Sequence, residues 1–307
     1  MKIIFMGTPE FAVSSLDALV ASHHDVLAVV TAPDKQKGRG RGMAMSEVKK
    51  RALELDLPVL QPAKLKDPVF IKSLNACKPD ILVVVAFRIL PPEVYELPTF
   101  GAVNAHASLL PKYRGAAPIH WAVYHGEKET GVTVFQIDRK VDTGRIILQE
   151  KIDILEDDTT GKLYGVLQKI SADALLKALD MLENDRVQTL PQNDVLATAA
   201  PKVHPDTGYL DFRRSGDELC RAVRAFTPWP GAFFMLNGQR IKVGKASFEV
   251  RPDTEPGRIE RLSKKKVAIH CLDGYFLPQA LQSPGRKMMD VVSWLNGTDL
   301  SGIRSID

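Results

Sequence analysis

The segment Ile81-Leu82-Val83-Val84-Val85-Ala86 decides the fold of this chain. A run of six apolar residues, three of them valine, is typical of a strand buried on both faces. Such strands occur in parallel sheets that are covered by helices on either side. A shorter strand is predicted downstream, at Gly101-Ala102-Val103-Asn104-Ala105-His106.

Strand-like and helix-like segments alternate along the first half of the chain. Residues 163–182 carry one apolar stripe at helical spacing, which predicts a long helix. The alternation indicates βαβ units, and so an α/β domain built on a parallel sheet with helices on both faces. Further strands are predicted at residues 2–6, 26–31, 131–137 and 146–154, and helices at residues 11–20, 46–55 and 159–183.

The pattern changes in the C-terminal third. Prolines at 191, 201 and 205 interrupt residues 187–205, which we interpret as a linker. Beyond it, a helix is predicted at residues 217–225. Asn237-Gly238 and Asp273-Gly274 each join two strand-like segments, which is a strong hairpin signal. Hairpins around one helix predict a small β-barrel, of which an OB-like fold is one option.

The composition is that of an ordinary globular protein. Of the 307 residues, 45% are hydrophobic and 25% are charged. No apolar run approaches the ~18 residues of a membrane span, and residues 1–6 enter a strand pattern without the apolar core of an export signal. The three cysteines are far apart and odd in number, which argues against a disulfide framework. We therefore expect a cytoplasmic protein with no membrane partner.

Positive charge is concentrated in two regions. Residues 208–307 carry 16 Lys and Arg against 11 Asp and Glu, whereas residues 1–207 carry 25 against 26. Residues 35–51 hold seven basic residues and one acidic residue, Glu47. Two basic regions suggest a polyanionic partner, although the C-terminal excess alone would by default be a solvated surface.

Asn104, His106 and Asp142 are a set of side chains suited to transferring an acyl group to an amine. Asn104 and His106 share one face of their strand, at the carboxyl end where open α/β sheets bind ligands. An amide can donate hydrogen bonds to a developing oxyanion, and an imidazole can donate a proton or positive charge. A carboxylate can fix the imidazole tautomer or accept the proton of the amine. Spacing by itself favours ordinary structural roles for all three residues.

A longer string decides between these interpretations. From Asn104 to Pro118 the chain reads Asn-x-His-x-Ser-Leu-Leu-Pro-x-Tyr-Arg-Gly-Ala-x-Pro. This string closely resembles the signature of the folate-dependent formyltransferases, a family that includes glycinamide ribonucleotide, sugar-nucleotide and methionyl-tRNA formyltransferases. The resemblance implies a Rossmann-like catalytic domain, with Asn104, His106 and Asp142 as catalytic residues and 10-formyltetrahydrofolate as the formyl donor.

The resemblance also implies where folate binds. Residues 108–111 match the stretch that binds tetrahydrofolate in the family, and residues 86–91 would form a second wall. The family often has an Ala-Tyr-Gly-hydrophobic run at the second place, whereas here the segment reads Ala-Phe-Arg-Ile-Leu-Pro and is one residue shorter. The expected folate-binding residues are Ser108, Leu109, Leu110, Pro111, Phe87, Arg88, Ile89 and Leu90.

Two further features resemble the methionyl-tRNA branch of this family. The Gly/Arg-rich insert at residues 33–42 looks like the loop with which that branch approaches the tRNA acceptor stem, and residues 225–232 resemble the start of its OB-like C-terminal domain. The implied partner is initiator methionyl-tRNA. The implied domains are a catalytic domain at 1–189, a linker at 190–207 and an OB-like tRNA-binding domain at 208–307. The residues expected to bind tRNA are Arg39, Arg41, Lys202, Arg258, Arg261, Lys264, Lys265 and Lys266.

Two alternatives stay open. A sugar-nucleotide N-formyltransferase would share the signature and the folate donor, and a catalytically silent RNA-binding protein could use the same scaffold. The intact Asn104, His106 and Asp142 argue against the silent protein. We expect a monomer. We also expect no metal ion, because no cluster of metal ligands is evident and His23 and His24 are expected to be solvated on a loop.

Overall fold

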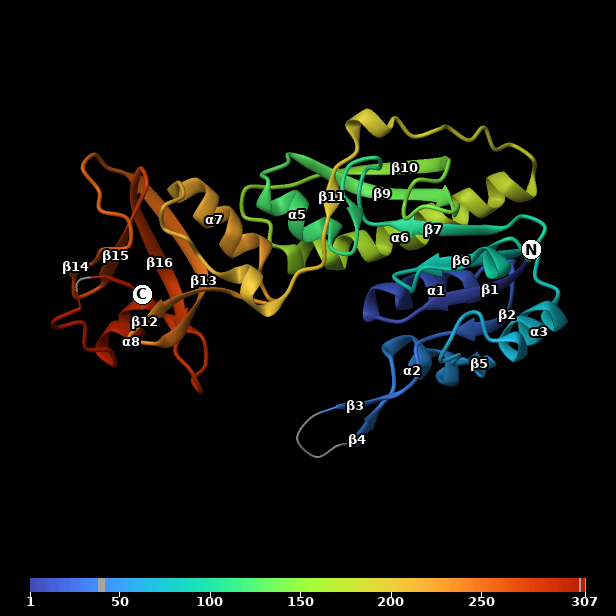
Figure 1. Cartoon of the computed structure of the whole chain (residues 1–307), viewed down its shortest axis with the longest axis horizontal. Coiled ribbons are helices and arrows are strands. Elements are labelled where there is room, and N and C mark those ends of the chain that lie inside the picture. Colours follow the sequence, from blue (N-terminus) through green and yellow to red (C-terminus); the bar gives the residue numbers. More distant parts are fainter. Residues whose placement is uncertain (38–41, 304, 307) are drawn as a thin grey trace. The chain divides into compact units, whose positions relative to one another are not determined.

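The computed structural model describes residues 1–37, 42–303 and 305–306 (Figure 1). The predicted tRNA contacts Arg39 and Arg41 lie outside these described residues. The predicted domains are continuous in sequence, whereas the compact units of the structure are not. By their contacts, the first unit comprises Met1–Pro118, Glu129–Asp153 and Tyr164–Ala200, and the second comprises Ile119–Lys128, Ile154–Leu163 and Pro201–Asp307.

A seven-stranded sheet in the order β10-β9-β7-β6-β1-β2-β5 forms the first unit (Figure 1). Strands β7, β6, β1, β2 and β5 are parallel, and β9 and β10 run antiparallel at one edge. The predicted α/β fold with a parallel sheet is therefore confirmed. The strands are β1 (Lys2–Gly7), β2 (Asp25–Val30), β5 (Val59–Leu60), β6 (Ile81–Val85), β7 (Ala102–His106), β9 (Glu129–Gln136) and β10 (Ile146–Asp153).

Helices cover both faces of this sheet. The chain moves from β1 to β2 through α1 and returns from β5 to β6 through α3, so right-handed crossovers place α1 and α3 on opposite faces. Helix α3 was not predicted; it begins after Asp67, whose carboxylate accepts a hydrogen bond from the backbone N–H of Val69 (2.9 Å). The helices of the first unit are α1 (Val13–Val20), α2 (Glu47–Glu54), α3 (Pro68–Cys77), α4 (Pro92–Tyr95) and most of α6 (Thr160–Glu183), with 3-10 turns at Glu10–Ala12 and Asp194–Leu196. Helix α5 (Pro118–Tyr124) belongs to the second unit except for Pro118.

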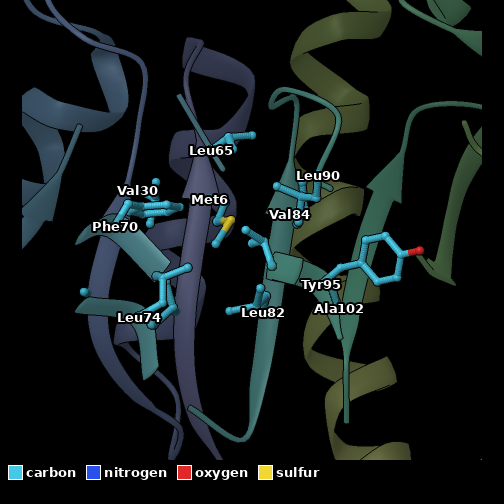
Figure 2. Packing of buried hydrophobic residues seen from close by; sticks show 13 residues of the cluster. Met6, Val30, Leu65, Phe70, Leu74, Leu82, Val84, Leu90, Tyr95 and Ala102 are labelled. Carbon is cyan, nitrogen blue, oxygen red and sulfur yellow. The ribbon is translucent and has the colours of Figure 1, made fainter. Parts of the chain in front are cut away.

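Figure 2 shows the core on the α3 face of the sheet. Phe70 and Leu74 of α3 belong to one buried cluster with Met6 of β1 and Leu82 of β6. Ala102, at the start of β7, belongs to the same cluster. Because side chains alternate along a strand, every second residue after Ala102 faces this side of the sheet.

Two short strand pairs complete the first unit. β3 (Lys35–Lys37) and β4 (Gly42–Ala44) pair with each other on either side of the residues that are not described. β8 (Arg114–Gly115) pairs in parallel with β11 (Ala199–Ala200), a strand within the predicted linker. That linker therefore contributes ordered backbone pairing next to residues of the family signature.

The second unit is built on an antiparallel sheet in the order β12-β13-β16-β15-β14, with β17 paired to β16. Both predicted hairpins are present, and positive φ angles at Asn237 (50°) and Gly238 (70°) form the first turn. The predicted smaller β domain is thus confirmed. Its elements are α7 (Gly216–Ala225), β12 (Ala232–Leu236), β13 (Gln239–Val250), β14 (Ile259–Ser263), β15 (Lys266–Cys271), β16 (Gly274–Gln282), β17 (Met289–Asp290), α8 (Val291–Asn296) and a 3-10 turn at Pro205–Gly208.

Candidate active site

Asn104 and His106 lie at the carboxyl end of β7, where the sequence places them. They follow Ala102 at alternate positions, so their side chains face the α3 side of the sheet, beyond its apolar core. His106 is buried and Asn104 is partly buried. Two polar side chains thus occupy the edge of the sheet where open α/β folds bind ligands.

Contacts on both sides of the ring hold His106. Its Nε2 atom lies 2.8 Å from the backbone carbonyl oxygen of Tyr113. A carbonyl only accepts hydrogen bonds, so Nε2 carries a proton in this contact. Nδ1 lies 3.8 Å from Oδ2 of Asp142. Nδ1 is therefore the ring nitrogen that is free to exchange a proton with Asp142 or with a bound molecule.

Asp142 lies between β9 and β10 and is fixed by residues distant in sequence. Its Oδ2 atom accepts a hydrogen bond from the backbone N–H of Gly115 (2.8 Å). Gly115 has a φ of +127°, and a Cβ atom there would lie 2.6 Å from the carbonyl oxygen of Ala200, so this position requires glycine. The side-chain amide of Gln192 donates to the carbonyl of Asp142 (3.0 Å). The carboxylate is thus held in position before any ligand binds.

The side chain of Asn104 has a buried polar atom whose hydrogen bonding the described part of the protein does not satisfy. Its carboxamide oxygen is buried and accepts no hydrogen bond from any residue within 1–37, 42–303 and 305–306. A buried polar atom left without a partner costs about 1–3 kcal/mol. A ligand that donates a hydrogen bond to this oxygen would explain why a buried polar atom is left without a partner here.

Residues 108–111 form a loop that is clamped from the neighbouring strands. The hydroxyl of Thr133 donates to the carbonyl of Ser108 (2.7 Å) and accepts from the N–H of Leu110 (3.0 Å). The amide of Gln149 donates to the carbonyl of Leu110 (2.9 Å). The side chains of Ser108 and Leu110 are buried, while Leu109 and Pro111 are partly exposed. The loop therefore presents the side chains of Leu109 and Pro111 at its surface.

Residues 87–90 leave the carboxyl end of β6, beside the point where the strand order reverses between β1 and β6. Leu90 is buried in the core and Phe87 packs against it. Ile89 is 73% exposed, which is unusual for a large apolar side chain next to a core. This loop therefore offers an apolar surface at the ligand-binding edge of the sheet.

Arg88, in the same loop, is directed back into the protein. Its guanidinium donates to the carbonyls of Pro62 (2.9 Å) and Ala63 (3.2 Å), and it lies 5.1 Å from the centre of the Phe87 ring. Its Nε atom is buried without a partner in the described part of the chain. Burial lowers the pKa of this guanidinium from its usual value. The contacts of Arg88 shape the loop.

The predicted tRNA-binding residues of the second unit lie on its surface. Lys264 and Lys265 form the turn between β14 and β15. The Nζ atom of Lys266 instead lies 2.7 Å from Oε1 of Glu249, so its charge is partly neutralised. The predicted set comprises Lys202, Arg258, Arg261, Lys264, Lys265 and Lys266, of which all but the partly buried Lys266 are exposed.

Sequence reasoning missed three residues that shape the site. Thr133 of β9 and Gln149 of β10 are directly opposite each other across the two strands. Thr133 is fully buried, and a polar residue between Val132 and Val134 in an apolar strand was a usable signal. Gln192 lies in the predicted linker, where no pattern marks it.

The prediction that His23 and His24 are solvated holds for His23, whose side chain is 62% exposed, and is wrong for His24. The side chain of His24 is 0% exposed, and both histidines lie beside Asp180 and Glu183 at the end of α6. Burial, followed by the charges of His23 and the N-terminal ammonium, lowers the pKa of His24. Hydrogen bonds from His23 and that ammonium lower the pKa of Glu183 to about 2. The fold joins groups that are about 160 residues apart in sequence.

None of the helices in the described part of the chain combines the length and apolar character that a membrane span requires.

Two family models match the sequence. Residues 1–179 match the model described as formyl transferase, and residues 202–299 match the formyl transferase C-terminal domain.

Two relatives that match nearly the whole chain are methionyl-tRNA formyltransferases. A methionyl-tRNA formyltransferase of Moorella thermoacetica is 41% identical over 97% of this chain and 96% of its own length. That of Ruminiclostridium cellulolyticum is 40% identical over 98% and 97%. Among solved structures, a sugar 3N-formyl transferase crystallised with dTDP and 5-N-formyl-THF aligns with a TM-score of 0.66, covering 94% of this chain and 99% of its own at 21% identity. That likeness concerns the fold alone.

Proposed function

This chain belongs to the formyl transferase family, and on that premise we propose that it transfers the formyl group of 10-formyltetrahydrofolate to the α-amine of initiator methionyl-tRNA. The product is N-formylmethionyl-tRNA for translation initiation. The choice of acceptor is supported by relatives about 40% identical over nearly their whole length, which are methionyl-tRNA formyltransferases. The sugar formyltransferase with a similar fold is only 21% identical.

The observation that carries this proposal is the grouping of Asn104, His106 and Asp142 at the carboxyl edge of the sheet. Attack of the neutral amine on the formyl carbon gives a tetrahedral intermediate with a negatively charged oxygen. The ester of the aminoacyl group lowers the pKa of the amine below the ~7.7–8.0 of an ordinary α-amine, so the neutral form is accessible. The side-chain N–H group of Asn104 donates to the oxyanion. Its buried Oδ1 atom, which accepts no hydrogen bond from the described residues, is available to accept one from the attacking amine.

His106 and Asp142 accept and pass on the proton that the attacking amine loses. The N–H of Nε2 is committed to the Tyr113 carbonyl, so Nδ1 is the atom that exchanges the proton. As the intermediate collapses, the bond between the formyl carbon and N10 of the folate breaks. The proton lost by the amine passes to Asp142 or His106, directly or through water, and N10 is reprotonated. Asp142 also stabilises positive charge on His106.

The folate lies, in this proposal, between the two loops that flank the site. Leu109 and Pro111 with the backbone of residues 108–111 form one wall, and Phe87 to Leu90 form the other. Ile89 is exposed at that edge and gains an apolar contact when the pteridine ring is bound. The transfer step as proposed uses amide, imidazole and carboxylate groups, and it includes no metal ion.

Positively charged side chains bind the phosphates of the tRNA. Lys264 and Lys265 at the turn of the second unit contact phosphates, with Lys202, Arg258 and Arg261 as further contacts. Arg39 and Arg41, outside the described residues, are proposed to reach the acceptor end and place the methionyl amine beside Asn104. The enzyme is proposed to act as a monomer in the cytoplasm.

The alternative acceptor is a sugar nucleotide, since the solved protein with a similar fold is named a sugar 3N-formyl transferase and was crystallised with dTDP. A side-by-side assay decides between the two. Methionyl initiator tRNA, methionyl elongator tRNA and an amino-sugar nucleotide are each incubated with enzyme and 10-formyltetrahydrofolate, and formyl transfer is followed. We expect rapid transfer to the initiator tRNA only. Transfer to the amino sugar with both tRNAs untouched would establish the alternative.

A further inference from the structure

A cluster of four potential metal ligands lies at the end of the sheet opposite to the candidate active site. His23 and His24 follow α1 and directly precede β2. Asp180 and Glu183, three residues apart, share one face of the last turn of α6. Parallel strands begin at this edge, whereas Asn104 and His106 lie where they end. The cluster therefore takes no part in formyl transfer.

The spacing of the donor atoms matches that around a small metal ion. Nε2 of His23 lies 3.0 Å from Oε2 of Glu183 and 3.7 Å from Oδ1 of Asp180. Nε2 of His24 lies 3.7 Å from the same Oδ1 atom. All the donor atoms lie within 4.8 Å of one another. Ligands bound tetrahedrally to zinc at about 2.0–2.1 Å are separated from each other by about 3.3 Å.

An orphaned atom within the cluster points to a ligand. The side chain of His24 has no exposed surface, yet its Nε2 atom has no hydrogen-bond partner among the described residues. The other ring nitrogen, Nδ1, lies 3.2 Å from the amino group of Met1. A buried imidazole nitrogen normally has a partner. The Met1 ammonium can only donate, so its contact with Nδ1 places the ring proton on Nε2, and a metal ion bound at Nε2 displaces that proton.

The charges in the cluster favour a cation. The cluster holds two carboxylates, those of Asp180 and Glu183, and the Met1 ammonium pairs with the second of them. The Met1 amino group binds Oε1 of Glu183 (2.9 Å), which leaves Oε2 directed at His23. Two imidazoles and two carboxylates are a donor set that suits zinc better than magnesium or calcium, because those ions prefer oxygen ligands alone.

We propose that His23, His24, Asp180 and Glu183 bind a structural zinc ion. Because all four potential ligands come from the protein, the site has the composition of a closed structural centre. The ion would join the segment between α1 and β2 to the end of α6. It stabilises the fold of the first unit and leaves the chemistry of formyl transfer unchanged.

The test uses the untagged full-length protein, because a histidine tag would itself bind zinc. The protein is stripped with a chelator, incubated with ZnSO4, passed through a desalting column and analysed for metal. We expect about one zinc per chain, and a rise in Tm on addition of zinc that a chelator reverses. Replacing zinc with Co2+ should give the visible absorption bands of a four-coordinate cobalt site.

Variants identify the ligands. His23→Ala and Asp180→Asn change exposed side chains and are expected to fold, whereas loss of the buried His24 could prevent folding. Each should weaken zinc binding at least tenfold or so and abolish the zinc-dependent rise in Tm. Asp173→Asn, an exposed carboxylate on the same helix, is the matched control and should bind zinc as the wild type does. The proposal is overturned if the wild type retains no zinc, or if His23→Ala and Asp180→Asn retain it unchanged.

Discussion

Nδ1 of His106 lies 3.8 Å from Oδ2 of Asp142, while Nε2 of the same ring is hydrogen-bonded to a backbone carbonyl. The carbonyl requires a proton on Nε2, so in a neutral ring the lone pair of Nδ1 faces a carboxylate. Protonation of Nδ1 turns this unfavourable arrangement into an ion pair. On this geometry we propose that Asp142 stabilises the charge that His106 acquires during formyl transfer.

Asp142→Asn should slow formyl transfer strongly with little effect on folding. The amide oxygen of asparagine can still accept the hydrogen bond from Gly115, so the turn keeps its shape. The negative charge beside His106 is lost. We expect kcat to fall by roughly 10²–10⁴, the usual size of a general acid–base contribution, and Tm to stay within a few degrees. Unchanged kcat in a folded variant would reduce Asp142 to a turn residue.

Thr133→Val tests the clamp on the 108–111 loop. Valine has nearly the same shape, but it leaves the carbonyl of Ser108 and the N–H of Leu110 without their partner. Each unsatisfied group costs about 1–3 kcal/mol, so both stability and folate affinity should fall. Thr130→Val, at another buried threonine of β9, is the control. Equal folate affinity in the two variants, measured by titration, would show that the clamp does not shape the folate site.

The double variant Lys264→Ala/Lys265→Ala tests the charge-based contact with tRNA. Both side chains are exposed at a turn, so stability should not change. If each lysine neutralises one phosphate, the slope of log K against log salt should become shallower by about 1 per lysine. Lys72→Ala, an exposed lysine of α3, is the control. A salt dependence identical to that of the wild type would remove this turn from the tRNA surface.

Cys220 of α7 provides a test of the second unit that depends on pH. Burial raises the pKa of its thiol to about 11. The folded state therefore keeps a proton that the unfolded state loses above about pH 9, and the resulting stabilisation is lost as the pH rises from 9 to 11. At pH 8 the native thiol should react slowly with iodoacetamide and rapidly after unfolding. Fast labelling of native Cys220, mapped by mass spectrometry, would contradict this burial.

Much of the fold was predictable because it follows from local patterns. The apolar run that forms β6 is typical of a buried strand, and Asn237-Gly238 is typical of a hairpin turn. Helix α3 was missed although Asp67-Pro68 is a good start signal, with a capping carboxylate followed by proline in the first turn. Short helices of this kind are easily overlooked when the neighbouring strands carry the stronger pattern.

The candidate site was predictable only in part, for physical reasons. Asn104 and His106 lie on one strand, so their proximity follows from spacing. The hydrogen bonds from Gly115 and Gln192 to Asp142 bring together residues 27 and 50 positions away, and no local pattern encodes them. The grouping of His24 with Glu183 is longer in range still. Such contacts depend on the packing of whole elements.

The central claim, that this site transfers a formyl group through an oxyanion held by Asn104, is tested most directly by Asn104→Ala. Its buried amide oxygen makes no hydrogen bond within the described chain, so removing it should not lower Tm. Asn75→Ala, at an exposed position of α3, serves as control. In single-turnover reactions with saturating 10-formyltetrahydrofolate and methionyl-tRNA, the account predicts transfer slowed by about 10²–10³ with folate affinity unchanged. Transfer at the wild-type rate in the folded variant would contradict it.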